Sequence, residues 1–182
     1  YNAASRTGTE AVCNVLSNLN FQLSGGVMYY RDANNNLVQY GATFGCLYPE
    51  LTTLILPDSL KSISNQALRN LPKLVEIKFP DTITSIGRWV FNQDVALKTV
   101  ELPDELVSIV SDVAGYNVLV TANHITGVTW SYHGTKLNDA SHTYLVNSIN
   151  NSNAVKLDFS NSCITVQDLL AMNVSSLTYL DI

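Results

Sequence analysis

Three consecutive stretches of the chain repeat one 23-residue pattern, and they begin at Leu51, Leu74 and Leu97. Five further columns match without a gap: Leu54, Ile77 and Val100; Leu56, Phe79 and Leu102; Pro57, Pro80 and Pro103; Leu60, Ile83 and Leu106; and Ile63, Ile86 and Ile109. One such unit cannot bury its apolar face alone, whereas stacked units form a continuous core. The repeat therefore predicts a solenoid.

Each unit has a simple expected course. Leu54 and Leu56 alternate with outward-facing neighbours, which predicts a short strand with one buried face. Proline then ends the strand because it has no N–H to donate, and the Pro-Asp pair favours a turn. We expect Ile63 to pack inward after the turn, and the Ala67-Leu68 pair to lie in a short helical turn on the opposite side.

This block resembles the leucine-rich repeats of the BspA-like bacterial surface family. The resemblance rests on the skeleton LxxIxLPxxLxxI and a following Ala-Phe-like pair, and it covers Leu51 to about Ala114. That pair departs from the family pattern, reading Val90-Phe91 in the second unit and Val113-Ala114 in the third. The resemblance implies an α/β leucine-rich-repeat solenoid in a bacterial protein that is secreted or displayed at the cell surface, with adhesion to a protein or glycan as its function.

Residues 1–50 do not fit the period and are expected to form an N-terminal cap. A capping box at Thr7–Glu10, followed by apolar residues at helical spacing from Val12 to Leu19, predicts a helix. Val27–Tyr30 and Leu37–Tyr40 read as two strands of a hairpin. Helix and hairpin would cover the open end of the solenoid, and an independent small domain is the alternative.

The remaining chain divides into two expected segments after the repeats of residues 51–114. Residues 115–153 are interpreted as a divergent or inserted β-rich segment, with a strand where apolar residues alternate from Val128 to Tyr132. Repeats are expected to resume over 154–182, where Ala154 and Leu177 are separated by the same 23-residue period. Because the sequence stops inside an expected strand, we expect a truncated product, with further repeats or a partner at this C-terminal edge.

Composition narrows the function classes. The net charge is −5, the pI is about 5.0 and only 14% of residues are charged, which argues against a nucleic-acid binder. No apolar run is long enough for a membrane span. Cys13, Cys46 and Cys163 form no CxxC pair, so we expect no metal and no cofactor, and Cys13 and Cys46 could be either bonded or free.

Chemical motifs are sparse. His124, His133 and His142 lie nine residues apart, a spacing that matches no zinc motif, and they are interpreted as surface or turn histidines. The column Asp58, Asp81 and Asp104 could attract a cation, but an aspartate after proline has a local role in a turn, which we favour. No GxSxG, HExxH, P-loop or GxGxxG pattern occurs, so we expect no enzyme. An active site in residues 115–153 would need converging polar groups in a deep pocket.

Outward-facing strand positions are the candidate binding residues. They are Thr53, Glu76 and Thr99 in one column, Ile55, Lys78 and Glu101 in the next, and Trp89 as a possible aromatic anchor. The simpler alternative is a solvated face, with Trp89 packed against a neighbouring unit. The sequence thus favours an extracellular binding module, and the alternative function is an accessory or spacer domain of a larger secreted or surface protein.

Overall fold

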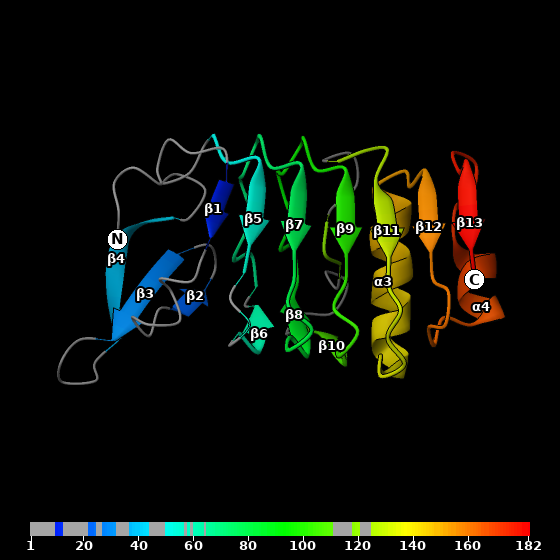
Figure 1. Ribbon diagram of the computed structural model, residues 1–182, viewed down its shortest axis with the longest axis horizontal. Coiled ribbons are helices and arrows are strands. Elements are labelled where there is room, and N and C mark those ends of the chain that lie inside the picture. The colour runs from blue at the N-terminus through cyan, green and yellow to red at the C-terminus, as the bar shows by residue number, and fades with distance from the viewer. Residues whose placement is uncertain are drawn as a thin grey trace.

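A seven-stranded parallel sheet runs along the length of the computed structural model (Figure 1). The structure describes residues 10–12, 22–24, 27–31, 37–43, 50–56, 58, 60–63, 65–110, 118–120 and 125–182. In spatial order the strands are β1 (Glu10–Val12), β5 (Thr53–Ile55), β7 (Glu76–Lys78), β9 (Thr99–Glu101), β11 (Thr129–Ser131), β12 (Lys156–Asp158) and β13 (Tyr179–Asp181). They follow the order of the chain, so each unit adds one strand beside the last.

The strand register confirms the repeat. Leu54 pairs with Ile77, and Ile77 pairs with Val100, in parallel ladders. The same column continues through Trp130 and Leu157, and all five side chains are buried. Because equivalent residues of successive units stack in register, the apolar sides of the units merge into one core.

A second, three-stranded parallel sheet accompanies the first. Its strands are β6 (Ser62–Ile63), β8 (Ser85–Gly87) and β10 (Ser108–Val110), and β8 lies in the middle. Ile63, Ile86 and Ile109 are paired across this sheet and are buried, as the sequence predicts. Each of the three regular units therefore gives one strand to each of two sheets.

The helical turn expected after this second strand does not form. Residues 65–68 and 88–93 are hydrogen-bonded turns instead. Gln66 and Trp89 occupy equivalent places and have φ of 59° and 54°, and the next equivalent pair, Asn70 and Gln93, has φ of 66° and 70°. A right-handed helix cannot pass through these left-handed residues, so the apolar pairs such as Val90-Phe91 are buried from a turn.

A helix occupies part of the segment predicted to be β-rich, so that prediction is wrong there. The strand expected near Trp130 is present as β11, but α3 (Asp139–Asn151) follows it. The Asn138 side chain caps α3 by accepting a hydrogen bond from Ser141 N at 3.0 Å. Leu145 and Ile149 lie four residues apart on its buried face, a helical period that outweighs the strand-like alternation before it.

The serines of α3 replace part of a backbone ladder. Ser141 Oγ accepts a hydrogen bond from Ile109 N of β10 at 2.9 Å, and Ser148 Oγ accepts one from Leu119 N at 2.8 Å. The seven-stranded sheet, hereafter the front sheet, is uninterrupted here. Thr129 pairs with Thr99 on one side and with Lys156 on the other, although each of them is separated from Thr129 by more than one repeat period in the sequence. The unit that begins with β11 thus holds the helix α3 at the position where the three regular units have a strand.

A short helix, α4 (Val166–Ala171), packs beside α3 in the last unit (Figure 1). It begins with a capping box in which Thr165 and Asp168 satisfy each other's backbone N–H groups. Next to it, β13 forms the outer edge of the sheet, where Tyr179 and Leu180 are about half exposed.

The N-terminal segment contains the predicted hairpin. Strands β2 (Gln22–Ser24), β3 (Val27–Arg31) and β4 (Leu37–Thr43) form an antiparallel sheet. The predicted helix is wrong over Glu10–Val12, because these residues gain a parallel ladder with β5. Residues 13–19 of that helix, and Cys13 and Cys46, lie outside the described residues. The role of residues 1–50 as a cap stays a prediction.

Candidate binding face

The sheet register assembles six of the seven predicted binding residues into two columns. Thr53, Glu76 and Thr99 are successive partners in one column, and Ile55, Lys78 and Glu101 are successive partners in the other. The first column continues through Thr129, Lys156 and Tyr179, and the second through Ser131, Asp158 and Asp181. All of these side chains are half-buried or exposed, because they alternate with the buried central column.

Trp89 does not join this face. It follows β8 in a turn of the chain, where its backbone N–H donates to Val118 O at 2.7 Å. The indole is half-buried, and the guanidinium of Arg88 lies 5.1 Å from the centre of its ring. The proposed aromatic anchor therefore belongs to a different part of the solenoid surface from the strand columns.

An open hollow of about 340 Å³ lies beside Lys78 and Glu101 of the second column, at the carboxyl ends of β7 and β9. It is lined by Lys78, Phe79, Asp81, Glu101, Leu102, Pro103, Asp104 and His133. The residues come from β7, β9 and the turns after β7, β9 and β11, so the parallel register brings them together. Asp81 and Asp104 are exposed here, which gives the hollow an excess of carboxylates over cationic side chains.

A small polar network fixes one side of the hollow. His133 Nδ1 donates to Ser160 O at 2.9 Å and lies 3.8 Å from Asp158 Oδ1. Ser160 in turn donates to Asp158 Oδ1 from its hydroxyl at 2.8 Å and from its backbone N–H at 3.2 Å. The two bonds from Ser160, with a smaller contribution from the charge of His133, lower the pKa of Asp158, so this side chain is a carboxylate at neutral pH.

The sequence did not single out His133 as a binding residue. A signal was present, since His133 is the last outward residue of the alternating stretch that predicts a strand. His142 was also misjudged: its side chain is only 14% exposed and bonds to Asp168, because the helix α3 turns it inward. His124 lies outside the described residues.

The chemistry available at the face is non-covalent recognition. Carboxylates, two lysines and hydroxyl groups can exchange hydrogen bonds and ion pairs with a polar ligand along the columns. In the described part of the chain, no group of three or more His, Cys, Asp or Glu side chains is arranged to hold a metal ion. No described helix is long and apolar enough to cross a bilayer.

The architecture is that of a leucine-rich-repeat solenoid, in which parallel strands form one face and turns or helices form the other. A family model for the BspA type leucine rich repeat region matches residues 42–178 in six copies, and the chain belongs to this family. Neither a curated protein nor a solved structure matches the chain significantly. Leucine-rich repeats of this type are generally surface binding scaffolds without catalytic activity.

Proposed function

We propose that the protein is an extracellular adhesion module that binds a protein partner along the outer face of its seven-stranded sheet. The observation that carries this proposal is the register, which aligns two columns of outward side chains over six strands and places Lys78 and Glu101 of the second column at the hollow. A rigid ladder of this kind holds its contact residues in place before binding, so little ordering entropy is lost on association.

The charges indicate which partner fits. Among the described residues at the hollow, Glu101, Asp81 and Asp104 surround a single lysine, Lys78, and the carboxylate of Asp158 lies beside His133. A partner segment that carries lysine or arginine would complement this group. Membership of the BspA-type family supports a location on the surface of a bacterial cell or in its surroundings, and we place the module there.

A glycan is the second candidate, and the hollow favours it. Carboxylates, a histidine and the apolar edges of Phe79 and Pro103 meet within one small cavity, a combination that suits a sugar ring with its hydroxyl groups and apolar face. A glycan would occupy the hollow alone, whereas a protein partner would also contact the columns towards β5 and β13.

Binding measurements can distinguish a protein ligand from a glycan. The chain would be screened against purified extracellular-matrix proteins and a glycan array, together with the variants Glu101→Lys, Thr53→Arg and Arg69→Glu. Arg69 is exposed in the turn region outside the front sheet and serves as the matched control. For a protein ligand, Glu101→Lys and Thr53→Arg should each weaken binding by roughly tenfold or more, while Arg69→Glu should not. For a glycan, only Glu101→Lys should have this effect.

An accessory or spacer role is the alternative function. It predicts that every ligand found in the screen binds the face variants as well as the parent. One observation favours it: β13 has an open edge with Tyr179 and Leu180 about half exposed, and Leu170 of α4 is 77% exposed. We propose that this edge pairs with a strand of another chain. Sedimentation of the parent and of Leu180→Lys would show whether the edge supports self-association.

A further inference from the structure

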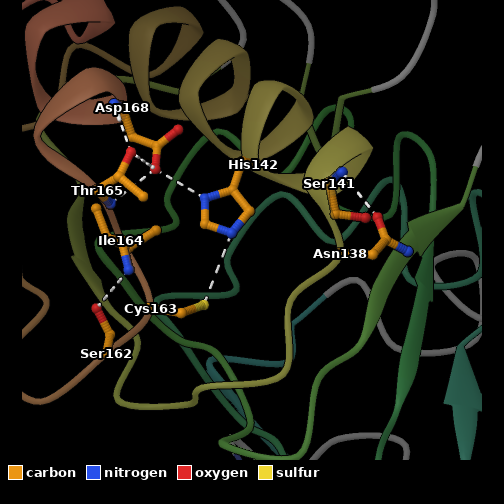
Figure 2. Close-up of polar contacts among 8 residues, drawn as sticks. All are labelled: Asn138, Ser141, His142, Ser162, Cys163, Ile164, Thr165 and Asp168. Carbon is orange, nitrogen blue, oxygen red and sulfur yellow. Dashed lines mark hydrogen bonds and ion pairs between the residues drawn. The ribbon is translucent and has the colours of Figure 1, made fainter.

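A cysteine, a histidine and an aspartate meet where α3 packs against α4 (Figure 2). Cys163 Sγ lies 3.7 Å from His142 Nε2, and His142 Nδ1 lies 2.7 Å from Asp168 Oδ2. Figure 2 shows the imidazole between the other two groups, with one ring nitrogen directed at each. This is the order of nucleophile, base and orienting carboxylate that activated thiols use.

The carboxylate is held by its own helix. Asp168 Oδ2 accepts hydrogen bonds from Thr165 N at 2.8 Å and from Thr165 Oγ1 at 2.7 Å. Burial raises the pKa of Asp168, but the bonds from Thr165 and from His142 outweigh this effect and hold the pKa below its usual range. Asp168 is therefore ionised, and a carboxylate can only accept, so the Nδ1 of His142 carries a proton.

This fixed tautomer leaves Nε2 free to accept the thiol proton. The side chains of His142 and Asp168 are 14% and 13% exposed, so water screens their pairing only weakly. Cys163 is not part of a disulfide and is partly exposed, and its backbone N–H donates to Gly134 O at 3.0 Å. The thiol is thus held against its base and still open to a small reagent.

One further titratable group faces the thiol. The hydroxyl of Tyr132 donates to Leu106 O at 3.1 Å, and burial together with the neighbouring Cys163 raises the pKa of Tyr132. Tyr132 therefore stays protonated and adds no negative charge next to the sulfur. The groups that set the reactivity of Cys163 are His142 from α3, Asp168 from α4 and this neutral phenol.

We propose that Cys163 is a covalent-modification site, a nucleophilic thiol that His142 activates and Asp168 positions for reaction with small soft electrophiles. With an alkyl iodide, the S–C bond forms as the C–I bond breaks. Iodide leaves with the bonding electron pair, and the thiol proton moves to Nε2 of His142. In this scheme His142 contacts the reacting group, and Asp168 is a positioning residue.

The test is the alkylation rate of the intact, folded chain with iodoacetamide. Mass spectrometry after digestion would follow Cys163 separately from Cys13 and Cys46. At neutral pH, Cys163 should react roughly tenfold faster than the same cysteine in the denatured chain, because a positioned base assists the transfer. Between about pH 6 and about pH 8 its rate should rise less than tenfold, whereas an ordinary thiol gains roughly 50- to 100-fold.

The variants His142→Gln and Asp168→Asn distinguish activation from packing. The asparagine oxygen can still accept from Thr165, so Asp168→Asn keeps the cap of α4 while it removes the charge that orients the imidazole. Both variants should return the steep pH profile and the slow rate of the denatured chain, with circular dichroism unchanged. A folded parent whose Cys163 reacts no faster than in denaturant, or a His142→Gln variant with the parent's flat profile, would overturn the proposal.

Discussion

Asp94 should make the solenoid less stable as the pH rises towards 8. The side chain is fully buried, and its Oδ1 accepts a hydrogen bond from Leu71 N of the preceding unit at 2.7 Å. Its other oxygen, Oδ2, has no hydrogen-bond partner among the described residues. Burial raises the pKa of Asp94 to about 8, against the smaller opposing effect of the backbone bonds from Leu71 and Asn70.

The sign and size of the effect follow from linkage. The native carboxyl keeps its proton up to about pH 8, whereas the unfolded one loses it near 3.8, so between these values the native state binds more protons. The contribution is therefore fully present below pH 3.8 and is lost as the pH rises through about 8. The slope is about 1.4 kcal/mol per pH unit, and the whole interval is worth on the order of 5 kcal/mol.

Asp94→Asn would remove this dependence. The amide oxygen can still accept from Leu71 N, and the NH₂ group takes the place of the protonated oxygen. Urea unfolding, followed by tryptophan fluorescence at several pH values from about 5 to about 7, should show that the free energy of unfolding of the variant rises relative to that of the parent by about 1.4 kcal/mol per pH unit. Asp81→Asn, at an exposed turn residue, is the control, and its free energy of unfolding should change with pH as that of the parent does. Equal slopes for Asp94→Asn and the parent would refute the reasoning.

Two further substitutions test the packing between units. A Cβ at Gly134 would lie 2.6 Å from Cε2 of Tyr132 and closer still to the Asp104 carbonyl oxygen. Gly134→Ala should therefore lower the free energy of unfolding in urea by about 1–3 kcal/mol. The control Thr135→Ala, at an exposed neighbouring residue, should leave it nearly unchanged. Ser148→Ala leaves the buried N–H of Leu119 without its acceptor and should cost about 1–3 kcal/mol, and a loss no larger than that of the exposed Asn147→Ala would contradict the role of α3 in replacing the ladder.

The front of the solenoid could be predicted because its information is periodic. Leu54, Ile77 and Val100 recur at one interval, and parallel pairing then places their outward neighbours in columns without further assumptions. Six of the seven predicted binding residues follow from this rule. Trp89 does not, because its left-handed backbone places it in a turn, and no local pattern marks that conformation.

The positions of His133, His142 and Cys163 depend on contacts between units of unequal length. His133 reaches the hollow beside Asp104 only because β11 pairs with β9 across an interval longer than the repeat period, which the periodic pattern does not reveal. His142 and Cys163 are 21 residues apart and come together through the packing of α3 and α4. A prediction of this second cluster would need the position of α3, whose first turns are polar and resemble a loop in sequence.

The unequal units have a consequence for how this fold can vary. Neighbouring front strands keep the same registered pairing whether one repeat period or a longer stretch of chain separates them, because hydrogen bonds between strands, rather than chain length, set the pitch. Extra residues are accommodated on the side of the solenoid opposite the front sheet, where α3 lies. Loops there can be lengthened or exchanged while outward side chains such as Lys78 and Glu101 keep their mutual distances, which makes that side the natural place to graft new segments.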